Sequence, residues 1–221
     1  MKEQTFRAAV FDLDGTLLDT LYDLGACANV ALQSFGFPEH TLEEYRGFIG
    51  NGIPKLIARA VPQGTPEAEI WQVLDFYLSY YPEHCAEHTK FFPGVPETIK
   101  ELKNRGYALA VLSNKTEATA KKIIAEYFPD APFCVVWGNN GVRPLKPATD
   151  AGELLLQELH CAPEEVFYLG DGDTDMAFAS RMHFFAAGAT WGYRSREVLT
   201  QNGADALFEH MKQILTVLPE K

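Results

Sequence analysis

Residues 8–16 read AAVFDLDGT, and this stretch decides how the rest of the sequence is interpreted. Its first part, Ala8–Phe11, is apolar without alternation, which is typical of a parallel strand buried on both faces. Asp12 and Asp14 follow the strand, and Gly15 allows the chain to turn sharply there. Because ligands of parallel sheets bind beyond the carboxyl ends of the strands, the stretch predicts two carboxylates at a binding edge.

Two clustered carboxylates can serve chemistry in two ways. Their oxygens suit Mg²⁺, a hard cation that takes oxygen ligands, and one of them in line with a phosphorus can act as a nucleophile. A surface Asp–Gly turn is the plainer explanation, because a lone D-x-D pattern is common. The longer pattern D-x-D-G-T is expected by chance in roughly one chain of this length in several hundred, so it favours a site.

The chain after residue 90 alternates between short apolar runs and amphipathic helical stretches. The expected strands are Tyr107–Leu112, Phe133–Trp137, Val166–Leu169 and Phe184–Ala187. The expected helices are Pro96–Arg105, Glu117–Tyr127, Ala148–Leu159 and Thr174–Met182. This alternation predicts an α/β fold with a Rossmann-like parallel-sheet core covered by helices on both faces.

Residues 20–88 differ, with about four helices and no convincing strand. Thr41 and Glu44 have the spacing of a capping box at a helix start. Because the first strand finds its partners only after residue 90, this block is expected to be an inserted helical domain. The predicted division is an α/β core of residues 1–19 plus 89–221 and a helical domain of residues 20–88.

Three further segments place polar side chains where strands end and helices begin. Ser113 and Asn114 follow the second strand, where a hydroxyl and helix N–H groups can hold an anion, although a helix N-cap is the plainer role of Ser113. Lys146 could offer a positive charge to a phosphate, although alone it is typical of a solvated loop lysine. In the sequence GDGDTD at 170–175, the helix dipole explains the later aspartates but not Asp171, which follows the strand directly.

The order of these elements (carboxylate pair, hydroxyl, lysine, acidic group) resembles the haloacid dehalogenase superfamily of phosphohydrolases over essentially the whole chain. The helical block resembles the α-helical cap of one subfamily, which includes the phosphoglycolate phosphatases. The resemblance implies a magnesium-dependent phosphatase that hydrolyses a small phosphorylated metabolite through an aspartyl-phosphate.

The resemblance also implies a role for each matched residue. Asp12 would be the nucleophile, and Asp14 the general acid and then base. Ser113, Asn114 and Lys146 would bind the phosphoryl group. The Asp12 carboxylate, the Asp14 carbonyl and Asp171 would hold Mg²⁺, with support from Asp175 and Thr16.

One departure and several alternatives stay open. Gly172 replaces a frequent small hydroxyl residue, which puts a supporting hydrogen bond in doubt. Asp14 argues against haloalkanoic acid dehalogenation, because enzymes of that type lack this acid.

A β-phosphoglucomutase-type sugar-phosphate mutase shares every motif. A phosphorylated receiver module would need a phospho-acceptor on the third strand, which ends in Gly138 here, and a silent scaffold would be surprising with all four elements intact.

The helical block is expected to choose the substrate by closing over the site. Its basic side chains Arg46, Lys55 and Arg59 and the loop Gly50-Asn51-Gly52 are candidates for binding a substrate carboxylate. Arg143 is a further candidate. Solvated helix faces are the plainer explanation of these cations.

Composition limits the partners. The 221 residues carry a formal net charge of −11, which disfavours nucleic acid and anionic membrane surfaces, so local cations must meet an anionic substrate. No run approaches 18 apolar residues and no signal-peptide pattern opens the chain, which favours a cytoplasmic protein. The four cysteines have no C-x-x-C spacing and are expected to be reduced, buried thiols. The sequence is compatible with a monomer or a homodimer.

Overall fold

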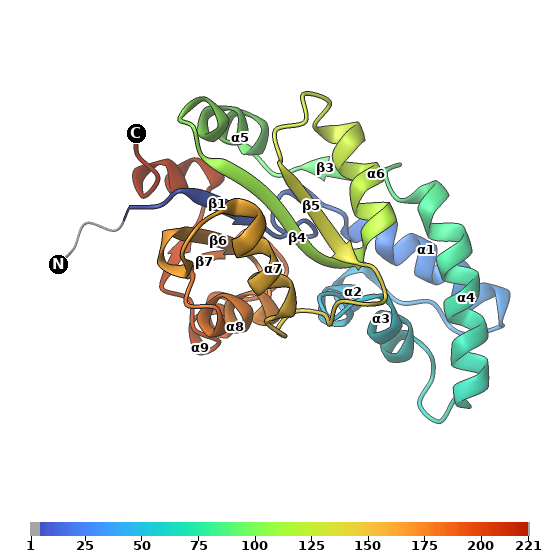
Figure 1. Ribbon diagram of the computed structural model, residues 1–221. Coiled ribbons are helices and arrows are strands. Elements are labelled where there is room, and N and C mark those ends of the chain that lie inside the picture. Colours follow the sequence, from blue (N-terminus) through green and yellow to red (C-terminus); the bar gives the residue numbers. More distant parts are fainter. Residues whose placement is uncertain (1–4, 221) are drawn as a thin grey trace.

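The computed structural model describes residues 5–220 (Figure 1). Its main feature is a six-stranded sheet of order β5-β4-β1-β6-β7-β8, in which every neighbouring pair is parallel. The strands are β1 (Ala8–Phe11), β4 (Ala108–Thr116), β5 (Val135–Asn139), β6 (Val166–Gly170), β7 (Phe185–Ala189) and β8 (Ala206–Phe208). The predicted α/β fold with a Rossmann-like parallel sheet is confirmed.

β1 lies between β4 and β6 in the middle of the sheet, and its four residues are fully buried. Successive side chains of a strand point to opposite faces. Ala9 and Phe11 pack into the hydrophobic core on one face, and Ala8 and Val10 pack into the core on the other. Burial on both faces explains why this run is apolar without alternation.

Helices cover both faces of the sheet. One face packs against α5 (Val95–Asn104), α6 (Glu117–Tyr127) and the 3-10 segment η2 (Met211–Thr216). The other packs against α7 (Asp150–Leu159), α8 (Asp173–Arg181) and α9 (Arg196–Gln201). The four helices predicted after residue 90 are present with ends that move by at most two residues, whereas β8, α9 and η2 were not predicted.

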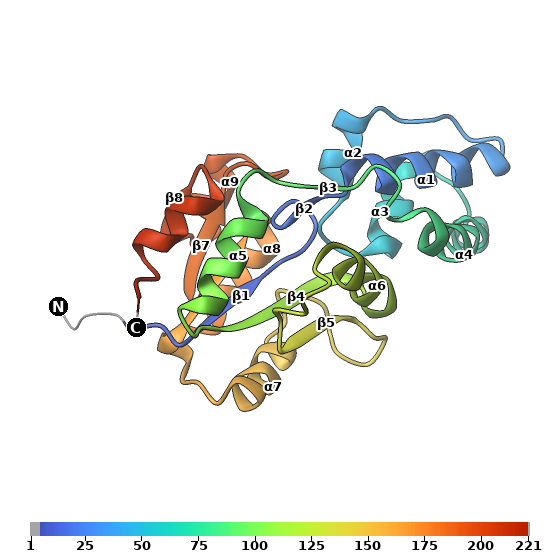
Figure 2. The same ribbon diagram turned by 90° about the horizontal axis from the view of Figure 1, so that it is seen from above.

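Four helices lie within residues 20–88, and we call them the helical insert: α1 (Leu21–Ser34), α2 (Leu42–Phe48), α3 (Ile53–Ala60) and α4 (Glu67–His84). Figure 2 shows them gathered at the carboxyl ends of β1 and β4. The predicted capping box at Thr41 and Glu44 is present at the start of α2.

The chain enters and leaves the helical insert through β2 (Leu18–Asp19) and β3 (Lys90–Phe91), which form a short antiparallel pair. Neither strand was predicted, because two residues carry no periodic pattern. The division into residues 1–19 plus 89–221 and residues 20–88 stays a prediction. No helix within residues 5–220 is both long and apolar enough to cross a membrane.

Three local expectations need correction. β4 runs on to Thr116, with irregular register after Leu112, so Ser113 is not the N-cap of α6; Thr116 is. The strand expected at Phe133–Trp137 is β5, which lies two residues later, at Val135–Asn139. Of the four thiols, those of Cys27 and Cys85 are buried, but Cys134 is exposed and Cys161 is half-buried.

Candidate active site

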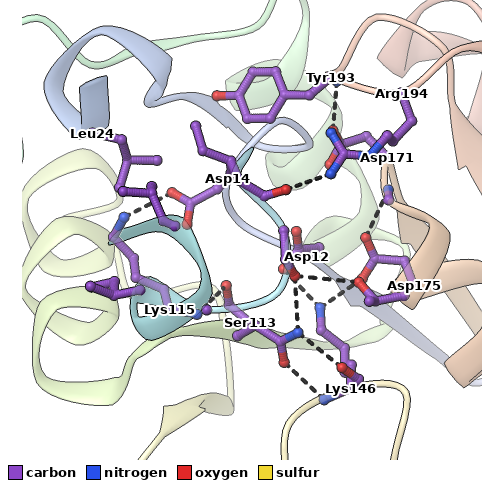
Figure 3. Close-up of a pocket in the computed structure, with 18 residues that line it drawn as sticks. Asp12, Asp14, Leu24, Ser113, Lys115, Lys146, Asp171, Asp175, Tyr193 and Arg194 are labelled. Atoms are coloured by element: carbon purple, nitrogen blue, oxygen red, sulfur yellow. Dashed lines mark hydrogen bonds and ion pairs between the residues drawn. The ribbon is translucent and has the colours of Figure 1, made fainter. Parts of the chain in front are cut away.

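Most of the core side chains singled out in the sequence meet in one pocket at the carboxyl ends of β1, β4 and β6 (Figure 3). The core side of the pocket includes the predicted residues Asp12, Asp14, Ser113, Asn114, Lys146, Asp171 and Asp175. The helical insert supplies the facing wall with Leu24, Ile49, Gly50, Gly52, Ile53 and Leu56. The pocket therefore has a charged floor and a largely apolar cover.

Lys146 lies at the centre of the charged groups and is only 5 % exposed. Its Nζ is 2.8 Å from Asp12 Oδ1 and 2.7 Å from Asp175 Oδ1. It also donates to the Leu112 carbonyl at 2.7 Å and contacts the Tyr168 hydroxyl at 2.8 Å. Burial lowers the pKa of Lys146, but the two carboxylates outweigh burial and the net pKa is raised. Lys146 is a buried cation, so its interpretation as a solvated loop lysine is wrong.

Asp12, Asp171 and Asp175 form a buried acidic cluster, in which one carboxylate oxygen of each lies within 4.8 Å of the others. Burial raises the pKa of Asp12 to about 7; Lys146 opposes the rise and the charge of Asp175 adds to it. Burial and the same acidic neighbours raise the pKa of Asp171 well above its usual range. The single positive charge of Lys146 therefore leaves negative charge uncompensated, and this donor set suits a divalent cation.

Hydrogen bonds fix the orientation of Asp171. The Thr16 hydroxyl donates to its Oδ1 at 3.0 Å, and the Tyr193 backbone N–H donates to its Oδ2 at 2.7 Å. Thr16 was predicted as a supporting residue, whereas Tyr193 was not. Trp191 also holds Thr16, because its indole N–H donates to the Thr16 carbonyl at 3.0 Å.

Asp175 is held by the protein through both carboxylate oxygens. Its Oδ1 accepts from Lys146 and from the Tyr168 hydroxyl at 3.0 Å, and its Oδ2 accepts from the Gly172 backbone N–H at 2.9 Å. A Cβ added at Gly172 would lie 2.8 Å from Asp175 Oδ2. A hydroxyl residue at position 172 would therefore require Asp175 to shift.

Asp14 is held by side chains that the sequence analysis did not single out. Its Oδ1 accepts from Lys115 Nζ at 2.9 Å and from the Thr20 hydroxyl at 2.6 Å. Lys115 is 4 % exposed, and its Nζ also lies 2.6 Å from the Tyr81 hydroxyl in α4. Asp14 thus lies where the core meets the helical insert.

Ser113 and Asn114 have different environments although they are neighbours. The Ser113 hydroxyl lines the pocket and accepts a hydrogen bond from the Lys115 backbone N–H at 3.2 Å. The Asn114 side chain instead holds the backbone of Lys146, accepting from its N–H at 2.8 Å and donating to its carbonyl at 3.1 Å. Its amide also donates to the Gly50 carbonyl at 3.1 Å, so Asn114 connects the lysine loop to the helical insert.

The loop after β7 is a further part of the site that the sequence analysis missed. Tyr193 accepts a hydrogen bond from the Thr20 backbone N–H at its hydroxyl, at 3.0 Å. Arg194 donates to the backbone carbonyls of Arg46 and Ile49 in the helical insert, and its Nε is 3.3 Å from Asp173 Oδ1 in α8. This loop therefore joins the acidic cluster to the helical insert.

Comparison with known proteins places this geometry in a family. The family model described as haloacid dehalogenase-like hydrolase matches residues 9–189. This chain belongs to the haloacid dehalogenase-like hydrolase family. The family predicted from the motifs is thereby confirmed, as is the prediction that the chain is a hydrolytic enzyme.

Relatives of this haloacid dehalogenase-like hydrolase match it over nearly its whole length. A protein of Haemophilus influenzae (strain 86-028NP) named phosphoglycolate phosphatase is 32 % identical over 220 residues, covering 96 % of this chain and 98 % of the relative. The crystal structure of a predicted phosphoglycolate phosphatase from Haemophilus somnus 129pt has a TM-score of 0.91 and 28 % identity, covering 97 % and 98 %. A phosphoglycolate phosphatase-like structure from Lactobacillus delbrueckii has a TM-score of 0.90 and 27 % identity, covering 96 % and 98 %.

Among the candidates for substrate recognition in the insert of this haloacid dehalogenase-like hydrolase, Gly50 and Gly52 line the pocket. The side chains proposed to bind the substrate do not: Arg46, Asn51, Lys55 and Arg59. Arg46 forms a surface ion pair, in which its Nε lies 3.3 Å from Oε2 of Glu43. Asn51 accepts a hydrogen bond from Arg59 at 2.7 Å, and Lys55 is exposed. For Lys55 and Arg59 the reason is that α3 turns its apolar side inward and its basic side outward.

Arg143 also lies outside the pocket. It forms an ion pair with Glu117, and its guanidinium lies 4.7 Å from the ring centroid of Trp137. It therefore stabilises the loop that leads to Lys146. Within residues 5–220, the cations that line the pocket are Lys115, Lys146 and Arg194.

Proposed function

We propose that this chain is a magnesium-dependent phosphatase that hydrolyses a small phosphate monoester, such as phosphoglycolate, through an aspartyl-phosphate on Asp12. The observation that carries the proposal is the position of the Asp12 carboxylate, which lies in the pocket 2.8 Å from the buried cation Lys146. A nucleophilic carboxylate needs a cation beside it, because the phosphoryl group that it attacks is anionic. The names of the curated relatives support the same activity.

The first chemical step forms a bond between Asp12 and phosphorus and breaks the ester bond to the leaving oxygen. Asp14 gives its proton to that oxygen, so an alcohol leaves. The Ser113 hydroxyl and the Lys146 ammonium hold the phosphoryl oxygens meanwhile. In the second step Asp14 takes a proton from water, the water oxygen attacks phosphorus, and the bond to Asp12 breaks to release phosphate.

The acidic cluster fits a magnesium ion. Asp12 and Asp171 would hold it, with the Asp14 main-chain carbonyl as the third ligand and Asp175 in support. Asp175 suits a supporting role because the protein already binds both of its carboxylate oxygens. When bound, Mg²⁺ would neutralise negative charge on the phosphoryl group.

The size of the pocket favours a small substrate. Its free volume is about 50 Å³, well below the roughly 300–1,000 Å³ of pockets that hold drug-sized ligands. The helical insert covers the charged floor with apolar side chains, which excludes water from the reacting groups.

A substrate panel tests the proposal. The purified protein is assayed for phosphate release from phosphoglycolate, pyrophosphate, nucleoside monophosphates and sugar phosphates, with Mg²⁺ or with EDTA. We expect Mg²⁺-dependent release with phosphoglycolate ranked high, and an acid-stable phosphorylated peptide that contains Asp12. Conversion of β-glucose 1-phosphate to glucose 6-phosphate instead of free phosphate would favour the mutase. No release from any ester would overturn the proposal.

A further inference from the structure

The side chain that selects the leaving group should lie beside Asp14, because Asp14 is the group that protonates the leaving oxygen. Lys146 does not meet this need, because its ammonium binds Asp12 and Asp175 and no hydrogen bond within residues 5–220 joins it to Asp14. Arg194 does not contact Asp14, and each of its three nitrogens binds an oxygen of the loop 46–49 or of Asp173. Lys115 is the pocket cation that touches Asp14.

The hydrogen bonds of Lys115 leave one donor for a ligand. An ammonium group has three N–H donors. Within residues 5–220, two of them are used, by Asp14 Oδ1 at 2.9 Å and by the Tyr81 hydroxyl at 2.6 Å. The group is 4 % exposed, and a buried charged donor without a partner is costly. Because Lys115 lines the pocket, its third donor can be satisfied by an anionic group of a bound molecule.

The two oxygens of Asp14 separate its contacts with protein from its contact with substrate. Lys115 and the Thr20 hydroxyl both bind Oδ1, and no hydrogen bond from residues 5–220 reaches Oδ2. Oδ2 is therefore the oxygen that can carry the proton to the leaving oxygen. Lys115, bound to the other oxygen of the same carboxyl group, is therefore next to the group that protonates the leaving oxygen.

We propose that Lys115 is the specificity-determining residue and that it binds a carboxylate on the leaving group. The substrate class would be the O-phosphorylated 2-hydroxy acids, in which the carboxylate carbon is two bonds from the leaving oxygen. Phosphoglycolate is the smallest member and suits the small pocket. This inference rests on the proposed phosphatase function and assigns recognition to the core strand β4 in place of Arg46, Asn51 and Lys55 of the helical insert.

Tyr81 acts as a positioning residue for this cation. Its hydroxyl lies 2.6 Å from the Lys115 ammonium and accepts a hydrogen bond from it. Burial raises the pKa of Tyr81 well above its ordinary value, so its hydroxyl stays neutral. Because Tyr81 belongs to α4, the helical insert orients the recognition residue without supplying the charge.

The test compares phosphoglycolate with ethyl phosphate, which has the same leaving-chain length but no carboxylate. We expect the wild type to prefer phosphoglycolate in kcat/KM. Lys115→Met should reduce this preference by roughly 10- to 100-fold, the range for a hydrogen bond between charged groups, with most of the loss in KM for phosphoglycolate. Lys55→Met, which removes an exposed cation of the insert, is the matched control and should keep the preference.

Equal losses for both substrates in Lys115→Met would show that the lysine only positions Asp14, and the inference would be wrong. If that variant fails to fold, the wild type still decides, because equal kcat/KM for both substrates also contradicts the inference. Tyr81→Phe should raise KM for phosphoglycolate more than for ethyl phosphate. If no phosphate ester is hydrolysed, the proposed function itself fails; hydrolysis without a preference for the carboxylate overturns the role of Lys115 alone.

Discussion

Nζ of Lys146 lies 2.8 Å from Oδ1 of Asp12, although 134 positions separate the two residues in the sequence. The same ammonium lies 2.7 Å from Asp175, and all three groups are nearly buried. One cation therefore balances part of the charge of an acidic cluster that also contains Asp171. Removing the cation and removing a carboxylate should consequently change the stability of the protein in opposite directions.

Lys146→Met should destabilise the protein and reduce phosphate release at least 100-fold. Removing one partner of a buried ion pair costs about 3–5 kcal/mol of the free energy of unfolding, because the remaining charges are left uncompensated. Urea unfolding at pH 8 measures the loss, with Lys100→Met on the exposed side of α5 as the control. The loss should be smaller at pH 5, where Asp12 is protonated in the fold; an equal loss at both pH values would contradict the electrostatic explanation.

Asp12→Asn should abolish turnover while leaving the fold intact. An amide is a poor nucleophile, so we expect a reduction of roughly 1,000-fold or more in kcat and no phosphorylated peptide after acid quench. Asp75→Asn, on the exposed side of α4, is the matched control and should retain wild-type turnover. Unchanged phosphate release by Asp12→Asn with Mg²⁺ would contradict the assignment of the nucleophile.

The pKa of Asp12 predicts how the stability of the metal-free protein depends on pH. Folding raises this pKa from 3.8 to about 7, chiefly through burial. The folded state therefore holds the proton more tightly than the unfolded chain, and stability is lost as pH rises from about 4 to 7. At 1.36 kcal/mol per pKa unit, the loss from this group is up to about 4 kcal/mol.

Urea titrations in EDTA at pH 5 and pH 8 measure this loss, which Asp12→Asn should largely remove. Added Mg²⁺ should raise the melting temperature at pH 8 more than at pH 5, because the metal competes with the proton for the same carboxylate. A metal-free protein that is more stable at pH 8 than at pH 5 would contradict the direction of the shift.

Several parts of the site could be predicted from sequence because they follow an apolar run directly. Asp12, Ser113 and Asp171 each come after an apolar run, and parallel strands bring such positions to one edge. The buried strands were recognisable because they are apolar on both faces. Strands of two or three residues, such as β2, β3 and β8, were missed because so short a run has no detectable period.

The remaining site residues could not be predicted because their roles come from contacts across the fold. Lys115 belongs to the same motif as Ser113, but its partners Asp14 and Tyr81 are 101 and 34 positions away. Tyr193 and Arg194 lie in a loop without a periodic pattern, and their contacts with Thr20 and Ile49 depend on the packing of the helical insert. Basic residues of the insert were expected to bind the substrate, but composition does not say which side of a helix faces the pocket.

Arg194 should keep the helical insert closed over the site. Its guanidinium joins the carbonyls of Arg46 and Ile49 to Asp173 of α8, and a Cβ added at Gly50 would lie 3.2 Å from one of its nitrogens. Hydrogen bonds from a charged donor contribute about 1.5–3 kcal/mol each, so Arg194→Met should shift the insert toward open states. We expect amide hydrogen exchange in residues 46–52 to become about tenfold faster or more, with a lower kcat/KM.

Arg196→Met, which removes a surface pair with Glu209 and touches no part of the insert, is the control. Unchanged exchange in residues 46–52 would contradict this role of Arg194 and would mean that other contacts, such as those of Asn114 and the Thr174 hydroxyl with the Gly50 carbonyl, suffice to hold the insert closed.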